Sequence, residues 1–65
     1  MDKVKQYIDY IKESIEETKQ EEKNDYNFGV VVGYVESLSI LKSLYDEDEW
    51  KSIGLDFDLD KKYLV

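Results

Sequence analysis

The stretch FGVVVGYVESLSILKSLY, residues 28–45, decides the fold class of this 65-residue chain. Read alone, three consecutive valines flanked by glycines favour a β-strand. Over the whole stretch, however, apolar residues recur at helical spacing: Phe28, Val31, Val35, Leu38, Leu41 and Tyr45. A valine costs under about 0.7 kcal/mol in a helix, whereas burying its side chain contributes roughly 1.5 kcal/mol or more. The stretch therefore predicts a helix over residues 27–45 that packs against a partner surface.

The N-terminal segment predicts another long helix. Its apolar side recurs every three or four positions, at Val4, Ile8, Ile11, Ile15 and Thr18. The opposite face carries lysines and acids of opposite sign three apart, which stabilise a helix by a few tenths of a kcal/mol per pair. We expect this helix over residues 2–22. The turn and cap formers of residues 23–27 then indicate an antiparallel hairpin.

A short third helix is predicted over residues 47–53. An acid at position 46 precedes this helix, and three acids at positions 47–49 form its first turn. There negative charge meets the positive end of the helix dipole. Asp46 and Glu49 have the spacing of a capping box. Gly54 is a suitable C-cap.

The following segment GLDFDLD, residues 54–60, alternates apolar and acidic residues. Alternation favours extended backbone, with the three aspartates on one side and the apolar residues on the other. Leu55, Leu59 and Tyr63 also lie four apart, so a helix remains the alternative. The expected fold is all-α or nearly so: one domain, residues 1–65, with an antiparallel two-helix hairpin, a short third helix and an extended acidic tail over residues 54–65.

Composition limits the chemistry. The chain contains neither cysteine nor histidine, so disulfides are excluded and the commonest ligands of zinc are missing. Neutral-pH catalysis usually needs one of these residues or a carboxylate in a dry pocket. Asp56, Asp58 and Asp60 are spaced as in an EF-hand, but Lys61 occupies the position that requires glycine. We therefore expect no enzymatic activity, no catalytic residue, no cofactor and no metal.

The net charge of −7, with no arginine, narrows the range of partners. An acidic surface repels nucleic acid and anionic membranes, and no apolar run approaches the roughly 20 residues of a membrane-spanning helix. Residues 46–60 hold seven acids and one lysine. A row of such acids can imitate a nucleic-acid backbone, so we expect a basic protein surface as partner, unless the charge only keeps the chain soluble. The expected partner-binding residues are Asp46, Glu47, Asp48, Glu49, Trp50, Asp56, Asp58 and Asp60.

Gly29, Gly33 and Ser37 lie four apart and form a helix-packing seam of small residues. Such a seam lets two helix backbones approach closely. It serves either an internal contact with the first helix or a specific partner helix. A chain of this size buries only about 60% of its unfolded surface, so a homodimer that forms a four-helix bundle is also expected. The six tyrosines are expected mostly at the edge of the core.

The lysine- and glutamate-rich first helix, the turn NDYNFG and a Gly-x-x-x-Gly-Tyr helix ending in Leu-Tyr-Asp resemble short acidic helical proteins of phages or mobile elements of low-GC Gram-positive bacteria. The resemblance covers residues 1–46 and implies an inhibitor of host machinery, located in the host cytoplasm. Our leading hypothesis is accordingly a small inhibitor or regulator that binds a basic, nucleic-acid-binding surface of a host protein. The alternative is a self-associating structural or adaptor module with no inhibitory role.

Overall fold

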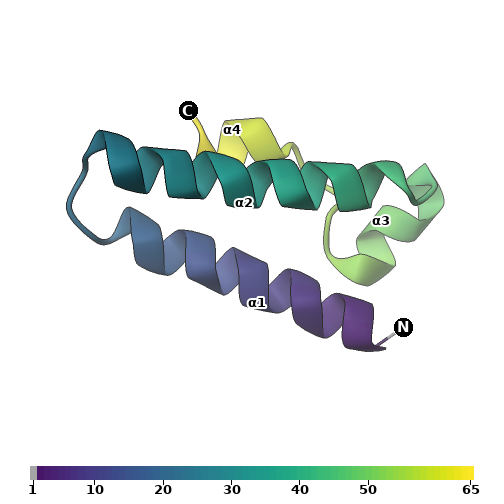
Figure 1. Ribbon diagram of the computed structural model, residues 1–65. Helices are drawn as coiled ribbons and strands as arrows, with labels where there is room; N and C mark the ends of the chain where they lie inside the picture. Colours follow the sequence, from purple (N-terminus) through teal and green to yellow (C-terminus); the bar gives the residue numbers. More distant parts are fainter. Residues whose placement is uncertain (1) are drawn as a thin grey trace.

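Two long helices and two short ones form the chain in a computed structural model that describes residues 2–65, with side chains from residue 3 onward. They are α1 (Asp2–Lys19), α2 (Asp25–Ser43), α3 (Glu47–Ile53) and α4 (Leu59–Tyr63). No strand occurs among these residues, so the predicted all-α class is confirmed. Helices α1 and α2 run antiparallel, α3 folds back at the end of α2 beside α1, and α4 packs against α2 (Figure 1).

Helix α1 ends at Lys19, three residues before the predicted end. Gln20 N still donates to Glu16 O and Glu17 O, both at 3.2 Å, but the helix does not continue. The apolar stripe stops at Thr18, and Glu21 and Glu22 are exposed. Two further acids at the negative end of the helix dipole are unfavourable, which explains the early end.

Helix α2 begins at Asp25, two residues before the predicted start, because Asn24 caps it. Asn24 Oδ1 accepts a hydrogen bond from Asn27 N at 2.8 Å. Asn27 Nδ2 in turn donates to Glu22 O, which closes the turn between the two long helices at 2.6 Å. Of the predicted cap formers, Asn24 is the cap, and the helix starts immediately after it.

Helix α3 has the predicted bounds. Asp46 N donates to Glu49 Oε1 at 2.9 Å, which is the glutamate half of the expected capping box. Gly54 ends the helix with φ of +84°, the left-handed conformation that favours glycine. The backbone then turns toward the core.

The acidic tail is only partly extended. Residues 55–58 lie outside helices, whereas Leu59–Tyr63 form α4, so the extended prediction is wrong for those five residues and the helical alternative holds there. Asp58 Oδ1 accepts from Lys61 N at 3.1 Å and caps α4. The predicted alternation is nevertheless confirmed in burial: Leu55 and Leu59 are buried and Phe57 is half-buried, while the aspartates between and after them are exposed.

One apolar core joins all four helices. It consists of Ile8, Ile11, Ile15, Val31, Val35, Leu38, Ile53, Leu55, Leu59 and Tyr63. The predicted stripe of α1 is thus confirmed, and so is the middle of the α2 stripe, whereas Phe28 at its start is exposed. Because α2 packs against both α1 and α4, its core-facing side is wider than a hairpin alone would require. Within residues 2–65, no helix combines the length and apolar character that crossing a bilayer requires.

Candidate functional site

All seven acids of residues 46–60 are exposed. The expected partner-binding acids fall into two neighbouring groups: Asp46, Glu47, Asp48, Glu49, Asp56, Asp58 and Asp60. The first is the α3 acidic turn, Asp46, Asp48 and Glu49. The second lines a groove between α3 and the start of α4.

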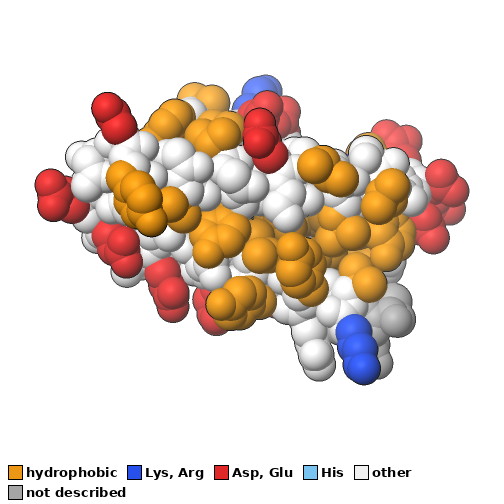
Figure 2. All heavy atoms as spheres, viewed as in Figure 1, with side chains coloured by type: hydrophobic (Ala, Val, Ile, Leu, Met, Phe, Trp, Pro, Cys, Tyr) orange, Lys and Arg blue, Asp and Glu red, His pale blue; other side chains and the backbone are white. Residues whose placement is uncertain are grey.

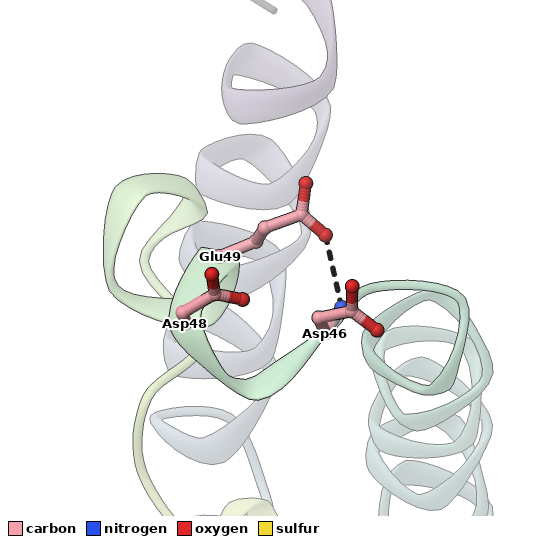
Figure 3. A group of neighbouring side chains, drawn as sticks. All are labelled: Asp46, Asp48 and Glu49. Carbon is pink, nitrogen blue, oxygen red and sulfur yellow. Dashed lines mark hydrogen bonds between the residues drawn. The ribbon is translucent and has the colours of Figure 1, made fainter.

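The α3 acidic turn is a tight group. One carboxylate oxygen from each of Asp46, Asp48 and Glu49 lies within 4.8 Å of the other two. Glu49 reaches back over the first turn of α3 to the backbone of Asp46, as Figure 3 shows. Because this capping bond explains the position of Glu49 and all three side chains are exposed, the grouping does not by itself indicate a metal site.

The groove is shallow and broadly open to solvent, with a volume of about 670 Å³. Glu47, Asp56, Asp58 and Asp60 line it together with Trp50, Phe57, Leu59, Lys42, Ser39 and Ser43. Residues from α2, α3 and the C-terminal segment therefore meet around one concave surface. Acidic side chains surround an aromatic wall there, an arrangement that suits a lysine or arginine side chain of a partner.

Most lysines near the groove are engaged by groups other than its acids. Lys42 Nζ donates to Phe57 O at 2.7 Å, and Lys19 Nζ donates to Tyr63 O at 3.2 Å. Lys12 Nζ and Lys62 Nζ lie 5.2 Å and 5.7 Å from the centroid of the Phe57 ring. Among the described side chains, the only ion pair joins Lys5 and Asp9 in α1, at 3.1 Å. The acids of residues 46–60 are thus not neutralised by ion pairs within the described chain.

Trp50 was expected to contact a partner, and the structure gives it a structural role first. Its ring is half-buried, and its Nε1 donates to Lys42 O at 3.1 Å and Tyr45 O at 3.3 Å. One part of the indole still borders the groove. Trp50 therefore joins α3 to the end of α2 and contributes only an edge to the candidate surface.

The two glycines of the small-residue seam do not pack inside the molecule. A Cβ atom added at Gly29 or Gly33 would meet nothing within 4 Å outside its own helix, so an internal contact with α1 is excluded at these two positions. Ser37 differs, because its Oγ lies 3.3 Å from Tyr7 Oη of α1. The internal contact is thus wrong at the two glycines and present at Ser37, and the partner-helix interpretation stays a prediction.

Sequence reasoning missed a second line of residues on α2, which we call the outer stripe. It consists of Tyr26, Val30, Gly33, Ser37, Ile40 and Leu44. These positions are separated by four, three, four, three and four residues, the heptad spacing with which helices pack on one another. The spacing is visible in the sequence, but the stronger core stripe of the same helix obscured it. Figure 2 shows that hydrophobic side chains gather along α2 and α1 on the viewed face, with acidic side chains around the edge.

The tyrosines divide between core and surface. Tyr63 is buried, Tyr34 and Tyr45 are half-buried, and Tyr7, Tyr10 and Tyr26 are exposed. The expectation that most lie at the core edge therefore fails for three of the six. Exposed tyrosines suit a contact surface because the ring is apolar and loses little conformational entropy on binding.

Comparisons with protein-family models, curated proteins and solved structures found no match for this chain. The resemblance to phage and mobile-element proteins therefore stays a prediction.

Proposed function

We propose that this chain is a small regulator or inhibitor that binds a basic, nucleic-acid-binding surface of another protein through its acids at positions 46–60. The observation that carries the proposal is that all seven of these acids are exposed, while the neighbouring lysines contact carbonyl oxygens and aromatic rings. An unneutralised group of carboxylates attracts lysines and arginines and steers their approach. If the chain is phage-encoded, the target lies in the host cytoplasm.

The groove provides a concave surface in which these acids can bind a single basic side chain. A partner lysine or arginine that enters between Asp56, Asp58 and Glu47 would also contact the exposed edge of Trp50 and the half-buried side chain of Phe57. These apolar surfaces would cover the methylene groups of the partner side chain while the carboxylates bind its charged end. The α3 acidic turn is adjacent in sequence to Glu47 and Trp50 of the groove. It would contact further basic groups at the edge of the same partner surface.

The test uses immobilised native chain to capture proteins from a low-GC bacterial lysate, followed by elution with rising salt or with duplex DNA. We expect a basic protein that both salt and DNA release, because DNA competes for the same surface and salt screens the attraction. The variant Asp56→Asn/Asp58→Asn/Asp60→Asn should lose this capture. Asparagine caps a helix about as well as aspartate, so α4 is expected to remain folded.

The matched control is Glu13→Gln/Glu17→Gln/Glu21→Gln, which removes three exposed acids from α1 and its following turn. Both triple variants change the net charge equally, so only the location of the lost charge differs. Capture that survives equally in both variants, or that DNA does not release, contradicts electrostatic mimicry of nucleic acid.

A self-associating structural or adaptor module is the second candidate, and the exposed outer stripe favours it. In that role the acids only keep the protein dispersed in solution. Self-association would then survive neutralisation of Asp56, Asp58 and Asp60. It would be lost on substitution in the outer stripe.

A further inference from the structure

The outer stripe is exposed although most of its residues are apolar. Tyr26, Ile40 and Leu44 are 78%, 65% and 74% exposed, and none of the six stripe positions carries a charge. A helix that is apolar on both its core side and its outer side is normally covered on both. The core of this chain covers only one side of α2.

We propose that two copies of this chain pair through their outer stripes, with α2 antiparallel to α2 of the partner subunit, to form a four-helix bundle. The pairing does not depend on the proposed binding of a basic surface, because the acids of residues 46–60 lie outside the stripe. A two-fold axis would pass close to position 35, the middle of the stripe.

Side-chain size along the stripe fits this arrangement. With the axis at position 35, Tyr26 would face Leu44 of the partner subunit and Val30 would face Ile40 of the partner subunit. Gly33 would face Ser37 of the partner subunit at the crossing point. Large apolar residues therefore meet at both ends and small residues meet in the middle, where they let the two helix backbones approach closely.

The glycine at the centre has no other explanation in the fold. Glycine destabilises a helix interior relative to alanine, and a Cβ at Gly33 would meet no atom within 4 Å beyond its own helix. Neither a turn, a positive φ nor an internal contact requires glycine at this position. Close approach of a second helix does require it.

The area is of the size that a stable dimer needs. Tyr7 and Tyr10 of α1 are 49% and 65% exposed, and Tyr7 lies on the stripe side because it contacts Ser37. With about 150–250 Å² for one aromatic side chain, the exposed parts of Tyr7, Tyr10 and Tyr26 amount to about 300–500 Å². Ile40, Leu44 and the glycine backbone add to this, toward the roughly 800 Å² that each partner buries in a stable complex.

Charge decides the orientation. A parallel pair would bring the two 46–60 segments, each with seven acids and one lysine, to the same end of the bundle. In the antiparallel pair the two α3 acidic turns lie beyond opposite ends of the paired helices, separated by about the length of the 19-residue α2, roughly 28 Å at 1.5 Å per residue. That distance is more than three times the Debye length of about 8 Å at physiological salt, so the repulsion is screened.

Sedimentation equilibrium from 1 to 100 µM tests the pairing. We expect the native chain to reach twice its 7.7 kDa mass. The variant Ile40→Glu should sediment as a monomer with unchanged helix content by circular dichroism, because the substituted side chain is largely outside the core. Phe28→Glu is the matched control: Phe28 is 59% exposed on α2 but outside the stripe, so this variant should remain dimeric.

Cysteine trapping tests the orientation, and the chain has no cysteine of its own to interfere. Val30→Cys and Ile40→Cys chains are mixed and oxidised, and the products are separated by mass. The antiparallel pair predicts a disulfide between the two different chains, because a disulfide requires Cα atoms about 4.4–6.8 Å apart. A parallel pair would instead link each variant to its own copy.

A native chain that stays monomeric at 100 µM overturns the proposal. The partner of the outer stripe would then be a different protein. A dimer that Ile40→Glu does not dissociate also overturns it, because the interface must then lie elsewhere. Exclusive self-linking of the Val30→Cys chain overturns the antiparallel arrangement. None of these results bears on DNA-competed capture by the acids, so the two proposals fail separately.

Discussion

Lys42 and Trp50 hold α2 and α3 together by two contacts between the same pair of residues. Lys42 Nζ lies 4.3 Å from the centroid of the Trp50 ring, and Trp50 Nε1 donates to Lys42 O at 3.1 Å. The Lys42 ammonium also donates to Phe57 O at 2.7 Å. One half-buried lysine thus joins α2, α3 and the segment that leads into α4, and it is one of the residues that line the acidic groove.

Replacing this lysine should destabilise the fold. A hydrogen bond from a charged donor contributes about 1.5–3 kcal/mol, so Lys42→Met should lower the free energy of unfolding by about 2 kcal/mol. Urea unfolding followed by circular dichroism measures the change. Lys51→Met in α3 is the control, because an exposed lysine without such contacts should change stability by less than about 0.5 kcal/mol. Equal effects of the two variants would contradict the role given to Lys42.

Alanine substitutions at two glycines should have opposite effects. Gly54 has φ of +84°, a conformation that costs other residues about 1–2 kcal/mol, so Gly54→Ala should destabilise the chain by about that amount. Gly29 lies within α2 with open space around it, so Gly29→Ala should stabilise the chain by up to about 1 kcal/mol. Thermal unfolding at a low protein concentration compares them. A loss of stability at both positions would show that Gly29 is packed against another part of the chain.

The cap of α4 depends on one side-chain oxygen. Asp58→Ala removes the acceptor for Lys61 N and should cost about 1 kcal/mol, whereas Asp58→Asn keeps an acceptor and should cost little. Helix content by circular dichroism and the urea midpoint distinguish the two variants. If both variants are destabilised equally, the charge of Asp58 contributes more to stability than its cap hydrogen bond does.

Stability should fall at alkaline pH through Tyr63. Burial, and to a smaller extent the negative charge of Glu16, raise the pKa of Tyr63 above its usual 10.0. Below pH 10 the phenol is protonated in both folded and unfolded chains, so its contribution to stability is complete. As the pH rises above 10 toward the higher folded pKa, the unfolded chain loses the proton first and the contribution decreases.

Tyr63→Phe cannot ionise and should make the alkaline decline shallower. Urea unfolding at pH 8, 9, 10 and 11 measures the slope in both proteins, and lysine ionisation is common to them. The comparison at pH 8, where the Tyr63 phenol is protonated in both the folded and unfolded chains, is the control for any pH-independent effect of the substitution. A Tyr63→Phe slope equal to the native slope would mean that Tyr63 ionises alike in the folded and unfolded chains.

The helices themselves could be predicted from local patterns. The spacing of Ile8, Ile11 and Ile15 placed the core side of α1, and the acids before Trp50 with Gly54 behind it placed α3 within its observed bounds. Helix ends were less predictable. The C-terminal end of α1 depends on where core contacts stop, and contacts are a property of the assembled fold rather than of a short window of sequence.

The candidate surface was predicted in its residues but not in its shape. The sequence placed the acids at positions 46–49 at the start of a short helix, and Asp56, Asp58 and Asp60 in a row on extended backbone. The structure divides them between the α3 acidic turn and a groove, because Leu55, Leu59 and Tyr63 are all drawn into the core and α4 forms between them. Trp50 changed role for a similar reason, since its indole N–H finds two carbonyl acceptors at the end of α2.

The sequence by itself determined the all-α class, the inward and outward sides of α1 and of residues 53–60, and the excess of acid near the C-terminal end, because periodicity and charge are local properties. Only the tertiary structure decided that the core covers a single side of α2. Both sides are apolar and both have helical spacing, so periodicity alone does not show that one of them stays exposed. The core took the side with Val31, Val35 and Leu38, whose bulk fills the space between α1 and α4, and left Gly33 and the rest of the outer stripe at the surface.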